Sequence, residues 1–393
     1  MTELADEVVQ WLEAHWDPDL PVEAWWKEVA AAGWTAPNFA PDQGGRGLSR
    51  RSQGVVRSAF ARFGALRPPG GLGLLMAAPT ILAHGTPDQI RRLVPPMLEG
   101  RVAWCQLFSE PGAGSDLAGL TTRAQRDGDR WIITGQKVWS SQAMQSDYGM
   151  LLARTNPDVP RHQGISWFAF PLDQPGVTIR PLREMTGHAV FNEVFLDEAV
   201  VDDADLIGGA GNGWAVTRTT LHFERTGIGA GGSHAGFPEP GPKGGMLGHR
   251  AGDAARDEAP NAKLTLGYGD VAALAAEHGQ GGDPHVRQAL ARLHTYTRIG
   301  AWNAQRGRAE AQRGGGQAVA GTAKLIQTRI VKLAASLATG ILGPGGLLDG
   351  EVAEAMVFSP ASSIYGGTDE IQRNILAERT LGLPRDPPQG VTA

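Results

Sequence analysis

Cysteine is almost absent from this chain of 393 residues, since Cys105 is the only one. A single thiol excludes a disulfide within the chain and a metal site built from several cysteine ligands. Long apolar runs are missing as well, because no stretch reaches about 18 uninterrupted apolar residues, the length typical of a membrane-spanning helix. We therefore expect neither a disulfide-stabilised fold nor a transmembrane span.

Clusters of basic residues are missing too. Lys and Arg number 36 against 41 Asp and Glu, which gives a net charge of -5. Neutralising nucleic-acid phosphates requires clustered basic side chains, so we expect no nucleic-acid partner. The first residues include Glu3 and Asp6 and show no basic region followed by an apolar run, so we expect no signal peptide. These absences together predict a cytoplasmic protein.

What is present is the composition of an ordinary globular protein. Hydrophobic residues make up 41% of the chain and charged residues 20%, which is typical of folded domains. A chain of this length is expected to form two or three domains. The 54 glycines and 26 prolines follow no fixed period, which indicates loops and one flexible segment, not a fibrous repeat.

Periodicity divides the chain into three parts and predicts an α+β fold. Residues 1–101 have apolar residues at helical spacing, and Thr86 followed by Pro87 is typical of a helix start. Residues 102–207 hold short apolar runs separated by turn clusters, as in an antiparallel sheet or barrel. Helical spacing returns in 208–393. A Gly- and Pro-rich stretch at about 231–264 interrupts it, and we expect a flexible insertion there.

Three segments carry residue types that suit a ligand site, although each has an ordinary explanation by itself. Ser109–Asp116 (SEPGAGSD) could let backbone N–H groups approach a ligand, or could be a plain turn. Gly135–Ser141 (GQKVWSS) offers an indole and two hydroxyls to a planar ring, or a buried Trp with capping serines. Tyr365–Arg373 (YGGTDEIQR) could direct a helix amino terminus at a phosphate, or Thr368 could act only as an N-cap.

In this order and at these separations, the three segments resemble the acyl-CoA dehydrogenase family over nearly the whole chain. The similar branch includes isovaleryl- and long-chain acyl-CoA dehydrogenases and actinobacterial dehydrogenases of bulky substrates such as steroid side chains. The resemblance implies an N-terminal helical domain, a middle β-barrel and a C-terminal helical bundle, with FAD between barrel and bundle. It also implies oxidation of an acyl-CoA thioester between Cα and Cβ to a trans-2-enoyl-CoA.

The resemblance assigns roles to individual residues as well. The FAD contacts that it implies are Gln106, Phe108, Ser109, Gly114, Ser115, Trp139, Ser140, Ser141, Gly340, Thr368 and Glu370. Among these, Trp139 would cover the isoalloxazine ring, with Ser140 and Ser141 near its N5 edge. Thr368 and Glu370 would approach the pyrophosphate and the adenine end. Gly340 lies in a segment through which a neighbouring subunit would touch FAD.

The expected catalytic base follows from a departure from the family pattern. α,β-Dehydrogenation needs a partly desolvated carboxylate whose pKa rises towards the working pH, so that it can take the α-proton. Many family members place this Glu directly after the motif Tyr, where this chain has Gly366. The similar branch places it on the first helix of the C-terminal domain, at the position of Glu224, although a surface Glu paired with an Arg is the ordinary alternative. Gly366 would offer its backbone N–H to the thioester oxygen, and Ser115, Phe223 and Arg225 would contact the substrate.

Partners and rival functions follow from the same resemblance. Family members usually carry an Arg-x-x-Phe-Gly segment whose Arg reaches FAD across a dimer, and the insertion at about 231–264 occupies that region here. The expected partners are the acyl-CoA, an electron acceptor such as electron-transfer flavoprotein, and further subunits in a homo- or hetero-oligomer. Two other functions stay open: a flavin oxidase or monooxygenase, and a non-catalytic subunit that completes FAD sites in a hetero-oligomer.

Overall fold

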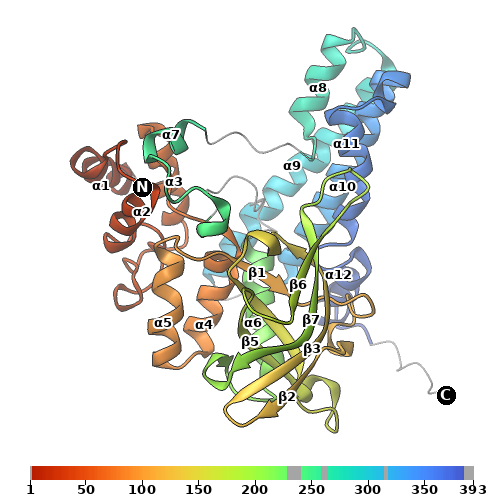
Figure 1. The fold of residues 1–393 in the computed structure, drawn as a ribbon. Coiled ribbons are helices and arrows are strands. Elements are labelled where there is room, and N and C mark those ends of the chain that lie inside the picture. Colours follow the sequence, from red (N-terminus) through yellow and green to blue (C-terminus); the bar gives the residue numbers. More distant parts are fainter. Residues whose placement is uncertain (1, 228–239, 258–263, 314–316, 385–393) are drawn as a thin grey trace, which may run out of the picture. The chain divides into compact units, whose positions relative to one another are not determined.

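The structure, a computed structural model, describes residues 2–227, 240–257, 264–313 and 317–384 (Figure 1). These residues belong to two compact units. The first unit holds the chain up to Glu224, apart from residues 185–187, together with the segment 240–257. The second unit holds the helical carboxy-terminal part, from residue 264 onwards.

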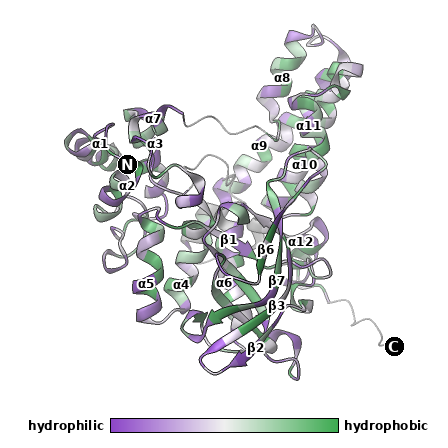
Figure 2. Cartoon of the chain, in the orientation of Figure 1, coloured by the Kyte–Doolittle hydropathy of each residue, from purple (hydrophilic) through white to green (hydrophobic). Residues whose placement is uncertain are grey.

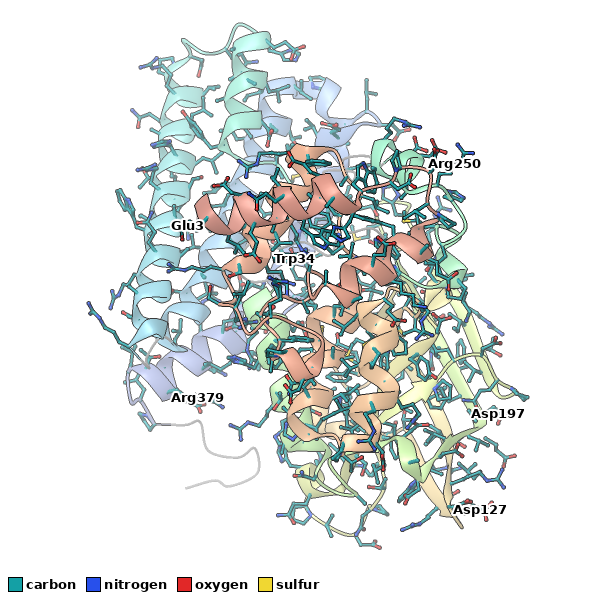
Figure 3. All side chains as sticks on the ribbon, turned by 90° about the vertical axis from the view of Figure 1, so that its left-hand side faces the viewer. Glu3, Trp34, Asp127, Asp197, Arg250 and Arg379 are labelled. Atoms are coloured by element: carbon teal, nitrogen blue, oxygen red, sulfur yellow. The ribbon has the colours of Figure 1, made fainter. Side chains whose placement is uncertain are left out.

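The amino-terminal part of the first unit is helical, as predicted. Its helices are α1 (Thr2–His15), α2 (Val22–Ala31), α3 (Ser52–Phe63), α4 (Ala78–His84) and α5 (Pro87–Leu98). Four fully buried aromatic side chains, Trp25, Trp26, Trp34 and Phe60, form much of the core between α1, α2 and α3, and Figure 3 shows Trp34 among these helices. The indole N–H groups of Trp25 and Trp26 donate to the carbonyls of Leu66 and Arg67, so the buried polar atoms of both rings are satisfied.

The start of α5 confirms the predicted cap. The Thr86 hydroxyl accepts from the backbone N–H of Gln89, and the Gln89 side-chain oxygen accepts from the backbone N–H of Thr86, with Pro87 in the first turn. The Gln89 amide also donates to the carbonyls of Ala204 and Leu206, at 2.9 Å each. The same side chain therefore caps the helix and fastens it to the end of the sheet.

The sheet has eight strands. They are β1 (Trp104–Leu107), β2 (Arg123–Asp127), β3 (Arg130–Ser141), β4 (Tyr148–Arg154), β5 (Ile165–Pro171), β6 (Val177–Leu182), β7 (Phe191–Asp202) and β8 (Leu206–Ile207). The order is β6-β7-β3-β2-β4-β5-β8, and β1 pairs with β4. Most pairs are antiparallel, as predicted, but β1 runs parallel to β4, so the sheet is mixed. In Figure 2, the end of the β2–β3 hairpin is hydrophilic.

Strand β1 separates two cores. Alternate side chains of a strand point to opposite faces. Cys105 and Leu107 belong to the core enclosed by the sheet, while Trp104 belongs to the core shared with α4, α5 and helix α6 (Gly213–Gly227). Gln106 lies on the same face as Trp104 and is half-buried. Burial raises the pKa of the Cys105 thiol to about 12, so this thiol stays protonated and unreactive.

The prediction of a flexible insertion is wrong for residues 240–257, which we call the docked segment. This segment contains a short helix, α7 (Ala251–Arg256), and Ala251 and Ala254 are buried in the core of α1–α3. Backbone hydrogen bonds join Val22 to His249 and Ala251 to Leu20, and Figure 3 labels Arg250 at the edge of these helices. Small side chains and distant backbone partners hold the segment, and neither produces a periodic sequence signal. The remaining residues of the predicted insertion lie outside the described residues.

The second unit is a bundle of helices. It contains α8 (Tyr268–Glu277), α9 (Pro284–Gln312), α10 (Gln317–Leu342), α11 (Glu351–Phe358) and α12 (Asp369–Ile375). Ala334, Ala338 and Ile341 of α10 are buried in the core of this unit. Among the described residues, the stretch Gly321–Leu347 is long and apolar enough to span a membrane by length and composition alone. That stretch includes Lys324 and is the central helix of the bundle, which is weak evidence for a membrane span.

We predict that Ala251→Glu destabilises the first unit by roughly 3 kcal/mol or more, because it places an unpaired charge in a closed apolar core. Chemical unfolding monitored by tryptophan fluorescence would measure this. Arg256→Ala is the matched control on the same short helix, and its exposed side chain predicts a change within about 0.5 kcal/mol. Equal midpoints for the two variants would contradict the docked position.

Candidate active site

A buried ion pair joins the first motif to the second. The Lys137 side chain on β3 is fully buried, and its Nζ donates to Glu110 at 2.8 Å and to the carbonyl of Phe108 at 3.2 Å. Glu110 accepts three further hydrogen bonds, from the Thr121 backbone N–H, the Thr121 hydroxyl and the Thr122 backbone N–H. The loop after β1 is thereby fixed against the strand that carries Trp139.

The pKa of Glu110 reflects two opposing influences. Burial is the largest influence and raises the pKa, because it disfavours the charged carboxylate. The charge of Lys137 and the hydrogen bonds from Lys137, Thr122 and Thr121 together outweigh burial and hold the pKa at about 2. Glu110 is therefore a permanent carboxylate near neutral pH and cannot act as a general base.

Trp139 is directed out of the sheet by a β-bulge. The register between β3 and β7 shifts between Lys137 and Ser140, and Trp139 has a φ of 60°. Such a backbone costs on the order of 1–3 kcal/mol in a non-glycine residue and is found at functional sites. The indole is 56% exposed and lies edge-on to the ring of Phe191, with 5.7 Å between ring centroids. The exposed face of the Trp139 indole is therefore a broad aromatic surface on which a planar ligand could stack.

The two serines after Trp139 differ in position. Ser140 is fully buried, and among the described residues its hydroxyl has no hydrogen-bond partner, whereas Ser141 is half-buried. Buried hydroxyls are nearly always paired, so an unpaired one beside an exposed indole suits a bound polar group. These features fit the edge and face of a flavin ring, the group that the resemblance implies.

The candidate base Glu224 lies on the inner face of α6. Thr217 and Thr220, which share this face at helical spacing, are fully buried. The Thr220 hydroxyl accepts from Thr80 of α4 at 3.1 Å, which fixes the rotation of α6 about its axis. Glu224 is half-buried, and its Oε2 accepts a hydrogen bond from the Gln106 amide at 3.2 Å. The structure thus brings one expected FAD residue and the expected base together.

Other expected residues of the first unit fall into two groups. Gly114 and Ser115 are exposed in the loop after the Glu110 turn. Phe108 is buried in the core against α4–α6, and the Ser109 carbonyl accepts from the Val138 N–H at 3.0 Å. Phe108 therefore presents a ligand mainly with its backbone, and Ser109 with its backbone and its hydroxyl.

In the second unit, glycines shape the third motif. Gly366 has a φ of 65° and Gly367 a φ of 87°. This left-handed backbone disfavours any side chain, so the position cannot readily accept the Glu of other family members. The hydroxyl of Thr368 accepts from the Ile371 N–H and caps α12, while Glu370 is exposed. Gly340 lies exposed near the end of α10. The prediction that Thr368 can cap this helix is confirmed.

The remaining expected substrate residues follow Thr220 on α6. Phe223 is half-buried beneath the guanidinium of Arg50, which lies 5.4 Å from the ring centroid, and Arg225 is exposed. Among the described residues, no group of three or more His, Cys, Asp or Glu side chains could hold a metal ion.

Comparisons with known proteins agree with this arrangement. Family models for the N-terminal, middle and C-terminal domains of acyl-CoA dehydrogenase match residues 1–101, 105–199 and 267–381. The acyl-CoA dehydrogenase IpdE1 of Mycobacterium tuberculosis is 38% identical over 371 residues, which cover 92% of this chain and 88% of IpdE1.

Two solved structures share the fold over 98% of both chains. The Tcur3481-Tcur3483 steroid ACAD has a TM-score of 0.74 at 26% identity. The ChsE4-ChsE5 complex from Mycobacterium tuberculosis has a TM-score of 0.70 at 25% identity.

The chain therefore belongs to the acyl-CoA dehydrogenase family. It is an oxidoreductase that carries out FAD-dependent dehydrogenation of an acyl-CoA, in a family of flavoproteins. The resemblance found in the sequence, including its actinobacterial branch, is confirmed.

We predict that the stability supplied by Glu110 is lost in acid. A carboxyl whose pKa is lowered in the folded state stabilises the fold above its ordinary pKa of 4.5, and this contribution disappears as the pH falls to about 2. Glu110→Gln should therefore show a flatter decline in the free energy of unfolding over that interval. At neutral pH it should be less stable by roughly 3–5 kcal/mol, since Lys137 stays buried without its counter-charge.

Urea unfolding at a series of pH values would test this. Asp88→Asn is the control, because Asp88 pairs with Arg91 at the exposed surface and a surface pair contributes about 0–1 kcal/mol. Parallel pH profiles for the parent and Glu110→Gln would show that the ion pair does not supply this stability.

Proposed function

We propose that this chain binds FAD non-covalently and uses Glu224 to remove the α-proton of a bulky acyl-CoA, giving a trans-2-enoyl-CoA. FAD, when bound, would supply the acceptor for the hydride that leaves the β-carbon. Trp139 would cover the ring, Ser140 and Ser141 would meet its edge, and the backbone at Phe108 and Ser109 would line the pocket. The other expected contacts, Gln106, Gly114, Ser115, Gly340, Thr368 and Glu370, belong to the same proposal.

One observation carries the assignment of the base. Glu224 is a half-buried carboxylate on the inner face of α6, bonded to a residue two positions before Phe108. A general base must reach the carbon acid while being shielded from water. The usual alternative position, Gly366, has a backbone that disfavours a side chain. The backbone N–H of Gly366 would then donate to the thioester oxygen as enolate charge develops on that oxygen.

Substrate class and partners rest on the relatives. The Tcur3481-Tcur3483 relative is a steroid acyl-CoA dehydrogenase, which supports a bulky acyl group as the substrate. The ChsE4-ChsE5 relative is a complex, which supports a homo- or hetero-oligomer. The second unit exposes several large apolar side chains that a neighbouring subunit would cover: Leu347, Leu348, Met356, Ile364 and Tyr365. We further propose that electron-transfer flavoprotein, or a similar acceptor, reoxidises the protein in the cytoplasm.

We predict that Glu224→Gln keeps FAD and substrate binding but loses flavin reduction by roughly 10²- to 10⁴-fold, because Gln cannot accept the proton. Anaerobic stopped-flow bleaching with a panel of acyl-CoAs would measure the loss. Glu277→Gln, at an exposed position of α8, is the control and should bleach at the parent rate.

Three outcomes would overturn parts of the proposal. An unchanged rate in Glu224→Gln would place the base elsewhere. A parent protein that never bleaches with any acyl-CoA would favour the non-catalytic subunit. Rapid peroxide formation by the reduced parent would favour an oxidase.

We predict that Ser141→Ala weakens FAD binding by about twofold to tenfold, since a single hydrogen bond contributes roughly 0.5–1.5 kcal/mol. Fluorescence titration of the FAD-depleted protein would measure the dissociation constant. Thr178→Ala removes an exposed hydroxyl from β6 of the same sheet and should leave that constant unchanged. An unchanged constant in Ser141→Ala would remove this hydroxyl from the flavin site.

A further inference from the structure

Gln106 is a polar residue on an apolar face of β1. Its neighbours on this face are Trp104, which stacks on Tyr148 at 5.0 Å, and Phe108, and both are buried. An amide placed against such surroundings is costly unless its N–H groups find an acceptor. A Met or Leu would fill the same space without that requirement, so the amide calls for an explanation beyond packing.

The acceptor comes from a distant part of the chain. The Nε2 of Gln106 donates to Oε2 of Glu224, 118 residues further on, over 3.2 Å. Both partners stand on rigid elements. Strand β1 is paired with β4 along its whole length, and α6 is tied to α4 through the Thr80–Thr220 hydroxyl pair and through His84 to Thr219 at 2.8 Å. The contact therefore joins two fixed supports.

We propose that Gln106 is a positioning residue for the base: its amide holds Glu224 in one orientation and stabilises the carboxylate that must accept the α-proton. This rests on the proposed role of Glu224 and extends it. A hydrogen bond to the charged form of a carboxyl favours that form over the protonated one, and it restricts a side chain that otherwise has several rotamers. In the removal of the α-proton, Gln106 then acts through Glu224.

Titratable and charged groups on the surrounding elements bear on the test. Arg50, in the segment before α3, lies over Phe223, and His84 of α4 bonds to Thr219. Burial lowers the pKa of His84 and raises the pKa of Tyr148 on β4. Helix α6 itself carries further charged or titratable residues: Arg218, His222 and Arg225. A change at Gln106 leaves all of them in place, so a shift in the titration of Glu224 reports the amide.

The first test needs no turnover. Infrared spectra of full-length, FAD-loaded protein without substrate, recorded from about pH 4 to pH 9 for the parent and for Glu224→Gln, isolate the protonated Glu224 carboxyl by difference. The same pair of spectra is recorded in a Gln106→Met background, which keeps the length of the side chain and removes the donor. We expect the titration midpoint to rise by about half to one pH unit, a threefold to tenfold change in the protonation ratio.

Two further variants sharpen this measurement. Gln106→Lys supplies a charged donor of similar reach and should move the midpoint below that of the parent, which also keeps the test open should Gln106→Met fold poorly. Gln136→Met removes a matched amide–carboxylate bond, Gln136 to Glu193 at 3.2 Å, and should leave the Glu224 midpoint where it is. Equal midpoints in the parent, Gln106→Met and Gln106→Lys would overturn the proposal.

The second test uses the rate of flavin reduction against pH. Because Glu224 must be deprotonated to act, Gln106→Met should move the acidic limb of the profile to higher pH, and the rate should approach that of the parent on the alkaline side. Loss by the same factor at every pH would indicate a general structural role and would contradict the proposal.

Failure of this inference can be told apart from failure of the proposed function. If Glu224→Gln reduces flavin at the parent rate, the proposed base is wrong. If Glu224→Gln loses activity while Gln106→Met keeps the parent's midpoint and profile, only the role of Gln106 is wrong.

Discussion

The site depends on the buried ion pair between Lys137 and Glu110. Neither charge could stay in the interior alone, and the pair is tolerated because Glu110 also accepts hydrogen bonds from Thr121 and Thr122. The same contacts fix the loop after β1 against β3. With that strand held, the bulge at Trp139 can keep its left-handed backbone, and the indole stays outside the sheet. An electrostatic constraint inside the protein thus sets the shape of the surface that carries Trp139.

Much of the fold could be predicted from sequence because its signals are local. The cap at Thr86 and the continuous apolar runs of β4 and β5 depend on neighbours within a few residues. Strand β2 gives no such local signal, because only Ala124 of its five residues is buried and the sequence shows no alternation. The docked segment was misjudged because Gly and Pro suggested flexibility, while its backbone partners, with Leu20, Val22 and Gly100 among them, lie more than 100 residues away in the chain.

The site shows the same division between local and distant information. The place of Glu224 on the first helix of the carboxy-terminal part came from the resemblance, and periodicity could not have supplied it. Gln106 was expected to face the cofactor, and its bond to Glu224 could not be foreseen across 118 residues. Lys137 and Glu110 stood inside two quoted motifs, yet nothing in either motif indicated that they pair. A Lys directly before Val138 and Trp139 in a strand is the signal that could have prompted a search for its counter-charge, because Lys is almost never buried unless it is paired.

The docked segment has a consequence for how the chain is made. Ala251 and Ala254 close the core of α1–α3, and Val22 pairs with the backbone of His249. Helices synthesised first therefore cannot complete their core until about residue 254 has left the ribosome. During that interval the tryptophan-rich surface of α2 stays partly uncovered, so the amino-terminal part cannot finish folding until translation has passed the sheet.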